Sequence, residues 1–233
     1  MIRDALSVHW RKVAGGLLAL ACLSAPSAVA AQAQPFSADI VTRHDDVSMR
    51  AGRLSVRDGR VRIETAEHPD GFFLVDTVKP QAWFVRPGAR VYMEARQSSR
   101  LTRTFVPLDP DAPCSQWQAM ARLAGGGDKD EWRCERTGIE TIDGHSTVAF
   151  RALSKTGEAF VGWIDRERRF PLRIRYGDGT LITLEQIKDE PQPASSFELP
   201  DAYGKFSPEA LIERIRQSDV WVARPEETQP SRP

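Results

Sequence analysis

Imidazole and carboxylate side chains are the residues of this sequence best suited to acid–base or metal chemistry. Apart from His9, its histidines are His44, His68 and His145. No two of them have the close spacing that places two imidazoles on one face of a helix for metal binding. His44 is followed by two aspartates, and carboxylates beside an imidazole can bind a cation. This cluster lies where a predicted strand ends, so a solvated turn is favoured over a metal site.

Motifs for nucleophilic or phosphate chemistry are missing from the sequence. It contains no G-x-S-x-G nucleophile elbow, no S-x-x-K arrangement, no P-loop and no dinucleotide-binding glycine pattern. The neighbouring carboxylates Asp109 and Asp111 belong to the proline-rich stretch LDPDAP, where they are explained by turn formation. We therefore expect a protein that is not an enzyme and needs no cofactor. A hydrolase whose catalytic groups are dispersed over several strands is the alternative.

The charge balance excludes strongly charged partners. The 233 residues include 32 Lys+Arg and 32 Asp+Glu, so no general attraction to nucleic acid is expected. Arginines are nevertheless concentrated on two predicted strand pairs, where they are expected to form the wet face of a sheet. Recognition of a phospholipid headgroup or docking of an acidic protein are the alternatives. These residues are Arg53, Arg57, Arg60 and Arg62, and Arg166, Arg168, Arg169, Arg173 and Arg175.

The first thirty residues have the pattern of a secretory signal peptide. Arg3, Arg11 and Lys12 precede an apolar run at residues 13–23, and Ala28-Val29-Ala30 supplies the small-x-small cleavage pattern. The apolar run is shorter than the roughly 20 residues that a membrane-spanning helix requires. We therefore expect residues 1–30 to be removed on export.

Cys22 raises a second possibility for the same segment. It follows Ala19-Leu20-Ala21, which is similar to the triplet before a lipidated cysteine, with the leucine displaced by one position. A lipid anchor at Cys22 is the minor alternative, because a better cleavage site follows it.

Two cysteines remain after the predicted signal peptide. Cys114 and Cys134 are expected to form a disulfide, because an exported chain passes through an oxidising compartment. A bridge closing a loop of about 20 residues would contribute on the order of 3 kcal/mol. Removal of residues 1–30 also takes away three basic residues and one acidic residue, which leaves 29 and 31 and a net charge of −2.

The remaining sequence predicts antiparallel strands joined by short turns. Apolar and polar residues alternate along most segments, and Asp-Gly pairs separate them at residues 58–59, 143–144 and 178–179. Asp-Gly favours hairpin turns of type I′, which need positive φ at both central residues. No alternation of strands with helices indicates a parallel sheet. Strands are predicted at residues 36–41, 53–57, 60–64, 71–76, 82–85, 90–95, 101–106, 136–142, 147–154, 158–165, 172–176 and 181–187.

A helix is predicted at residues 116–124. It carries the apolar residues Trp117, Met120 and Leu123 and ends at a run of three glycines, residues 125–127. Two interpretations are open. The segment is either a short packing helix or a mobile lid, since the glycine run would permit movement.

A second helix is predicted to begin at Ser207, the N-cap, with Pro208 in the first helical position. Its apolar side is formed by Leu211, Ile212, Ile215 and Trp221. The polar, proline-rich residues 223–233 are predicted to be a disordered tail. No linker divides the rest, so residues 31–222 are expected to form a single domain.

Several segments resemble, in type and order, those of the bacterial periplasmic lipoprotein-carrier superfamily (LolA/LolB-like). Within that superfamily, the sequence is similar to a small exported member with a cysteine-stapled middle. They are GRLSVRDGRVRIE (52–64), FLVDTVKPQAWFVRPGARVYME (73–94), DAPCSQW (111–117), CERTGIETIDGH (134–145), GWIDRERRFPLRIRYGDG (162–179) and FELPDAYGKF (197–206). The resemblance implies a mainly β fold with a few helices. In it a strongly curved antiparallel sheet, a half-barrel, is covered by helices on its concave face. It also implies a periplasmic protein.

Physical reasoning adds support for a hollow. A sheet of about a dozen strands curls, and its inner face must be filled by side chains or by a ligand. Two modest helices leave open whether the interior is packed or contains an apolar cavity. Alternation assigns to the inner face, as candidate ligand contacts, Phe36, Ile40, Leu54, Val56, Val61, Ile63, Phe72, Leu74, Val148, Phe150, Trp163, Ile174 and Leu184.

The sequence thus predicts a monomeric periplasmic protein that binds a lipid, an acyl chain or an acylated protein. A role in trafficking of outer-membrane lipoproteins or lipids would follow from the resemblance. The alternative is an accessory or sensor domain that binds another envelope protein.

Overall fold

The computed structural model describes residues 34–95, 99–125 and 131–217. The predicted signal peptide, Cys22, Trp221 and the predicted tail lie outside these residues, so their interpretation stays a prediction. Within the described part of the chain, no helix combines the length and apolar character needed to cross a membrane.

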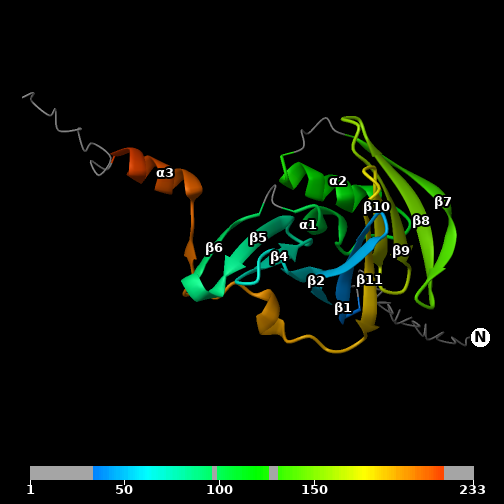
Figure 1. Ribbon diagram of the computed structural model, residues 1–233, viewed down its shortest axis with the longest axis horizontal. Coiled ribbons are helices and arrows are strands. Elements are labelled where there is room, and N and C mark those ends of the chain that lie inside the picture. Colours follow the sequence, from blue (N-terminus) through cyan, green and yellow to red (C-terminus); the bar gives the residue numbers. More distant parts are fainter. Residues whose placement is uncertain (1–33, 96–98, 126–130, 218–233) are drawn as a thin grey trace, which may run out of the picture. The chain divides into compact units, whose positions relative to one another are not determined.

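The described residues form one large sheet with the strand order β12-β6-β5-β4-β3-β2-β1-β11-β10-β9-β8-β7 (Figure 1). Two meanders, β1 to β6 and β7 to β11, are joined by the pairing of β1 with β11. All neighbours are antiparallel except β12 and β6, which pair in parallel. The strands are β1 (Phe36–His44), β2 (Val47–Arg57), β3 (Arg60–Thr65), β4 (Phe72–Asp76), β5 (Gln81–Arg86), β6 (Val91–Glu94), β7 (Trp132–Ile142), β8 (His145–Ser154), β9 (Ala159–Asp165), β10 (Phe170–Tyr176), β11 (Leu181–Lys188) and β12 (Gly204–Lys205).

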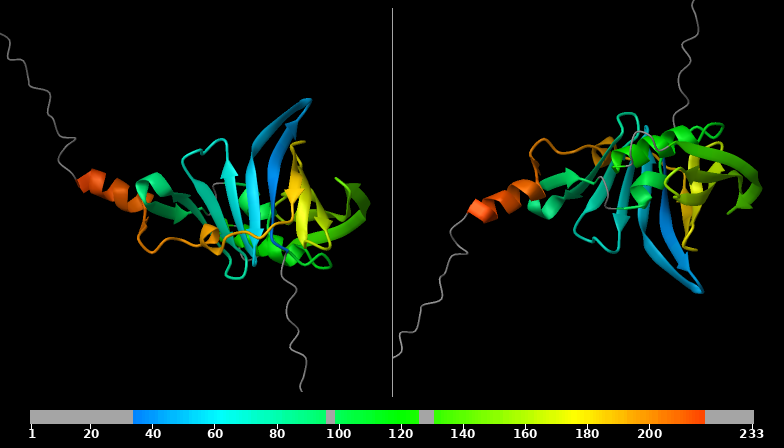
Figure 2. Two further views of the ribbon diagram at one scale, coloured as in Figure 1. Left: turned by 90° about the horizontal axis from the view of Figure 1, so that it is seen from below. Right: turned by 90° about the horizontal axis from the view of Figure 1, so that it is seen from above.

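The sheet is strongly curved and open, since its two ends β12 and β7 do not pair (Figure 2). The predicted fold class, a mainly β half-barrel with few helices, is confirmed. Three α-helices and two 3-10 helices complete the described elements. They are η1 (Pro87–Ala89), α1 (Leu101–Thr104), α2 (Cys114–Leu123), η2 (Ala194–Phe197) and α3 (Pro208–Gln217).

The Asp-Gly turns differ from one another in backbone conformation. Asp58 and Gly59 have φ of 49° and 77°, and Asp143 and Gly144 have 48° and 80°, as a type I′ turn requires. In the third turn, Gly179 has a φ of 85° but Asp178 is not among the residues with positive φ. Here the amide of Tyr176 bonds to the carbonyl of Thr180, so the loop is longer by one residue. Two of the three turns therefore have the predicted type.

The concave face of the sheet is covered by α1, α2 and the chain between them. Phe105, Trp117 and Met120 belong to the same buried cluster as the strand residues Ile40, Leu54 and Ile174. This cluster is the main core of the described residues.

The segment 101–106 was predicted as a strand, and this is wrong. Residues Leu101–Thr104 form α1. The hydroxyls of Thr102 and Thr104 donate to the carbonyls of Ser99 and Arg100 at 2.9 and 3.0 Å, bonds available only in a helical turn. Tertiary packing of Phe105 and Val106 under the sheet overrides the β-propensity of the threonines.

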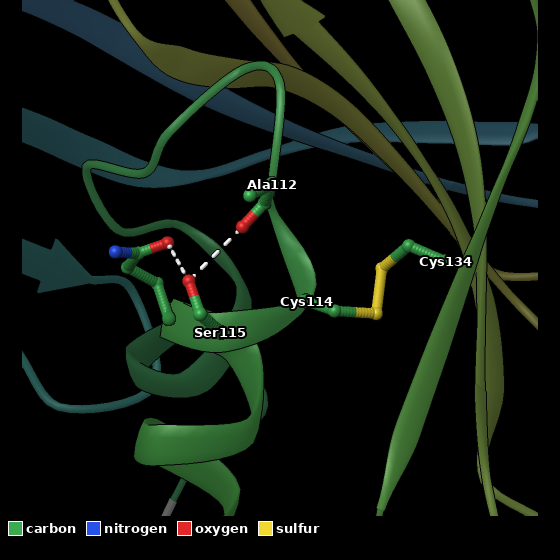
Figure 3. The surroundings of a disulfide bond; sticks show 5 residues. Ala112, Cys114, Ser115 and Cys134 are labelled. Carbon is green, nitrogen blue, oxygen red and sulfur yellow. Dashed lines mark hydrogen bonds between the residues drawn. A yellow bond between two sulfur atoms is a disulfide. The ribbon is translucent and has the colours of Figure 1, made fainter.

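The predicted disulfide is present between Cys114 and Cys134 (Figure 3). It joins the first residue of α2 to β7, with 5.6 Å between the two Cα atoms. Next to it, the Ser115 hydroxyl lies within hydrogen-bond distance of the carbonyl of Ala112, at 3.0 Å, and of Oε1 of Gln116, at 2.7 Å. The bridge therefore fixes the start of the covering helix to the edge of the sheet.

Helix α3 begins as predicted, because the Ser207 side chain accepts a hydrogen bond from the amide of Ala210 at 3.2 Å. Two residues of its predicted apolar side are exposed to solvent. Leu211 and Ile212 are 45% and 49% exposed.

The convex face is covered over part of the sheet by the segment that connects β11 to β12, drawn in orange in Figure 2. Phe197 from η2 packs there with Phe72, Leu74 and Val85 in a second buried cluster. Arg62 donates to the carbonyl of Ser196 at 3.3 Å. Strand β4 is therefore buried on both faces.

Arg168 was expected on the wet face with the other arginines, and this is wrong. It is buried between two carboxylates: Nη1 lies 2.6 Å from Oδ2 of Asp165, and Nη2 lies 2.5 Å from Oδ2 of Asp189. Nη1 also lies 3.0 Å from Nδ1 of His145. Arg168 thus locks the turn between β9 and β10 to the chain after β11.

Candidate functional site: an apolar pocket on the concave face

Most of the residues predicted to line a cavity form the packed core. Those in the main cluster on the concave side are Phe36, Ile40, Leu54, Val56, Val61, Ile63, Val148, Phe150, Ile174 and Leu184. They pack against the chain that covers the sheet. Their role as ligand contacts stays a prediction.

Phe72, Leu74 and Trp163 lie on the opposite face from the one predicted. Phe72 and Leu74 contact Phe197 on the convex side. Gly162 of β9 faces the covering helix, because a Cβ built there would lie 2.8 Å from the indole of Trp117. Its neighbour Trp163 must therefore point outward, since successive residues of a strand alternate between faces.

The predicted lid residues lie on α2. Trp117 and Met120 are buried, while Leu123 is half-buried. The Trp117 indole N–H donates to the carbonyl of Thr104 at 3.0 Å, and its ring meets Phe160 edge-on at 4.8 Å. In this structure α2 packs against the concave face of the sheet at β9 and β10. Movement of α2 as a lid stays a prediction.

A pocket of about 400 Å³ opens on the concave side of β1 to β4 and β11, at the end next to α1. Its size is typical of small-molecule sites. Apolar side chains provide much of its surface, and polar groups stand among them. The lining residues are Thr42, Met49, Ala51, Thr65, Ala66, Glu67, His68, Phe73, Ser99, Arg100, Leu101 and Ile182.

The floor of the pocket exists because of a β-bulge between β1 and β2. Ile40 pairs with Gly52 and Val41 pairs with Arg50, so Ala51 has no partner on β1. A bulge re-aims the extra residue, and here that residue lines the pocket. Ala51 is too small to fill the space that larger residues occupy further along the same strands.

His68 forms one wall with two aromatic rings. Its imidazole lies edge-on to Phe73 and Phe84, with ring centroids 5.8 and 5.3 Å apart. Its Nδ1 lies 3.4 Å from the hydroxyl of Thr65. The wall is therefore apolar on one side and able to form a hydrogen bond on the other.

Arg100 provides a cation at the rim. Its guanidinium bonds to Asp178 and stands over the ring of Tyr176, 5.2 Å from the centroid. The bond to Arg100 lowers the pKa of Asp178 to about 2. The Tyr176 hydroxyl lies 2.7 Å from that of Thr104, and burial raises the pKa of Tyr176 to about 12. The rim is thus anchored to the turn between β10 and β11.

The apolar surface continues from the pocket to the β1–β2 hairpin. Met49 lines the pocket and is 60% exposed, and Val47, which follows on the same face, is 67% exposed. An apolar ligand in the pocket would therefore contact Met49 at the entrance.

The described residues contain no group of three or more His, Cys, Asp or Glu side chains placed to hold a metal ion. His44 and Asp45, singled out in the sequence, approach each other only to 3.9 Å at an exposed turn. Sequence reasoning missed the pocket residues. The signal available was the pair of small residues Ala51 and Gly52 next to the strand predicted at residues 53–57.

No protein-family model matches this sequence, and no curated protein matches it. Solved structures do match in three dimensions. PNGF-II has a TM-score of 0.49 at 6% identity, with 79% of this chain and 33% of that chain covered. MucB in complex with MucA has a TM-score of 0.34 at 13% identity, with coverages of 75% and 57%.

A third match is a domain of a proposed outer membrane lipoprotein-sorting protein from Vibrio parahaemolyticus. Its TM-score is 0.30 at 10% identity, with 71% of this chain and 88% of that chain covered. The chain spans about a third of PNGF-II and little more than half of MucB. Similarities of this size do not transfer a ligand, partner or activity. Membership in the lipoprotein-carrier superfamily stays a prediction.

Proposed function

We propose that the protein is a non-catalytic exported protein that binds a lipid, an acyl chain or a lipidated protein in the concave-face pocket. The observation that carries this proposal is the pocket itself, which combines the apolar residues Met49, Phe73 and Ile182 with polar groups that include the guanidinium of Arg100. Burial of an acyl chain contributes roughly 0.8 kcal/mol per methylene. An anionic head could bond to the guanidinium of Arg100 at the opening by sharing it with Asp178.

The disulfide supports the predicted location. Cys114 and Cys134 are paired, and such bridges persist in oxidising compartments such as the periplasm. The resemblance of the sequence to periplasmic lipoprotein carriers points the same way.

Copurification is the first test. The protein is purified from the bacterial envelope without detergent, extracted with organic solvent, and the extract is analysed by mass spectrometry. We expect acyl-containing molecules in stoichiometric amount. The purified protein should also enhance the fluorescence of a dansyl-labelled fatty acid.

Two variants locate the binding. Ala51→Trp fills the pocket floor, and Met49→Glu places a carboxylate at the exposed entrance, where folding is not at risk. Both should weaken binding of the fatty acid at least tenfold. Val78→Trp, at a side chain that is 74% exposed and outside the pocket, is the matched control and should bind normally. A protein free of lipid that takes up no probe, or unchanged binding in both pocket variants, would refute the proposal.

A further inference from the structure

The outer face of β7 to β10 carries a second hollow, on the side of the sheet away from the apolar pocket. It has a volume of about 510 Å³ and is built around the indole of Trp163. Its lining includes Ile139, Glu140, Arg151, Val161 and Arg175. The acyl-binding proposal makes no use of this hollow.

Trp163 and Glu140 form a fixed polar centre. The indole N–H donates to Oε2 of Glu140 at 2.7 Å, and Nη1 of Arg173 donates to Oε1 at 3.0 Å. Both oxygens of the carboxylate are therefore engaged. The guanidinium groups of Arg173 and Arg175 stand 5.7 and 5.5 Å from the Trp163 ring centroid. The negative charge of Glu140 is thus balanced by Arg173, and Arg175 adds a further positive charge.

Arg151 and Arg175 provide two cations that form no close ion pair in the described part of the chain, although Glu135 of β7 stands opposite Arg151. Within residues 34–95, 99–125 and 131–217, neither guanidinium lies within 4.0 Å of a carboxylate oxygen. Other arginines of the strands do have such partners, for example Arg60 with Asp76 at 3.3 Å and Arg62 with Glu64 at 2.8 Å. The outer hollow therefore has an excess of positive charge.

The sheet register sets the spacing of the two cations. Arg151 pairs with Val161, and Val161 pairs with Arg175, so the three residues form one row across β8, β9 and β10. Strands that are two apart in a sheet lie about 10 Å apart. A single small anion is too small to contact both guanidinium groups at once. Two carboxylates on one chain can do so.

We propose that this hollow binds an acidic, extended segment of a partner protein. Glutamate or aspartate side chains on alternate residues would be about 7 Å apart. The long arginine side chains can cover the difference between this spacing and the distance of about 10 Å between the two strands. Guanidinium–carboxylate pairs are charge-assisted and often bidentate.

The test uses the whole chain and a fluorescein-labelled peptide with the core sequence Glu-Leu-Glu, with Gln-Leu-Gln as its neutral match. Binding is followed by the fluorescence anisotropy of the labelled peptide. We expect the acidic peptide to bind at least tenfold more tightly than the neutral one. Its affinity should fall as salt is added, because the contacts are ionic.

The double variant Arg151→Gln, Arg175→Gln should lose at least tenfold in affinity for the acidic peptide. Arg43→Gln removes an equivalent exposed charge outside the hollow and is the matched control, which should bind normally. Absence of peptide binding, equal binding of both peptides, or an equal loss in Arg43→Gln would overturn the proposal. Binding to phosphatidylglycerol vesicles that depends on Arg151 and Arg175, without peptide binding, would overturn it in favour of a membrane.

Peptide binding in the outer hollow is expected to be independent of the apolar pocket. The double variant should take up the dansyl-labelled fatty acid like the unmodified protein, and Met49→Glu should bind the acidic peptide normally. Failure of one proposal therefore leaves the other measurable.

Discussion

Trp117 of the covering helix and Gly162 of β9 are in direct contact. A Cβ on Gly162 would lie 2.8 Å from one carbon of the indole and 3.0 Å from another. The indole also donates its N–H to the carbonyl of Thr104. One side chain thus connects α2, the end of α1 and strand β9, and the glycine makes room for it.

This contact predicts that Gly162→Ala destabilises the protein by about 1–3 kcal/mol, the usual cost of overpacking a core. The added methyl group would also meet Ile174 at 3.1 Å, so neither neighbour can yield freely. The free energy of unfolding is measured by urea denaturation. Gly138→Ala is the matched control, because nothing lies within 4 Å of its added Cβ. Equal stabilities of the two variants would contradict the packing described here.

Removal of the disulfide is expected to cost about 3 kcal/mol. Cys114 and Cys134 are separated by 20 residues, and a crosslink of this span removes a corresponding amount of chain entropy from the unfolded state. The double variant Cys114→Ser, Cys134→Ser should unfold at a lower urea concentration than the oxidised protein. Adding a reductant should lower the stability of the unmodified chain and leave the double variant unaffected.

Arg168→Met should destabilise the protein by about 3–5 kcal/mol, because it leaves the buried carboxylate of Asp165 without its cation. The neighbouring Arg166→Met removes an exposed pair with Asp111 and should cost less than about 1 kcal/mol. Thermal unfolding of the two variants separates these cases. A small effect of Arg168→Met would mean that water reaches Asp165.

Alkaline pH is expected to destabilise the protein through Tyr176. Burial raises its pKa to about 12 from 10.0, so the neutral phenol is favoured in the folded state. This stability is fully present below pH 10 and is lost between about pH 10 and 12, as the unfolded chain ionises first. The loss is on the order of 2–3 kcal/mol. In Tyr176→Phe the stability should change less over the same interval, and a parallel decline in both proteins would exclude Tyr176 as the cause.

Affinity for fatty acids should rise with chain length until the concave-face pocket is full. Each added methylene is expected to contribute roughly 0.8 kcal/mol, which is about fourfold in the dissociation constant. Isothermal titration calorimetry with a series of saturated fatty acids measures this slope. Arg100→Gln should lower the affinity for the carboxylate form and leave the dependence on chain length unchanged. An affinity that does not depend on chain length would indicate a surface contact only.

The sequence was sufficient to predict much of the local structure. The alternation of apolar and polar residues and the Asp-Gly turns predicted most strands, because both signals depend on neighbours along the chain. The start of α3 followed from Ser207 and Pro208 for the same reason. The disulfide followed from having two cysteines after a predicted export signal.

The faces of the strands depended on contacts between distant residues. In β9, the large apolar Trp163 was assigned inward, yet Gly162 faces the core because Trp117 fills its place. In β4, every residue from Phe72 to Val75 is buried, since Phe197 covers the second face. Alternation alone cannot choose between two buried faces. Nor could it show that Thr102 and Thr104 belong to a helical turn.

The concave-face pocket was determined by tertiary structure alone. Its residues come from β1, β2, β3, β4, β11 and the start of α1, and no local pattern joins them. A hollow forms where the covering chain leaves space, and the bulge at Ala51 shapes its floor. The sequence determined the strands and their turns through short-range preferences, whereas the position of the hollow depended on how segments far apart in the chain fill the curved face.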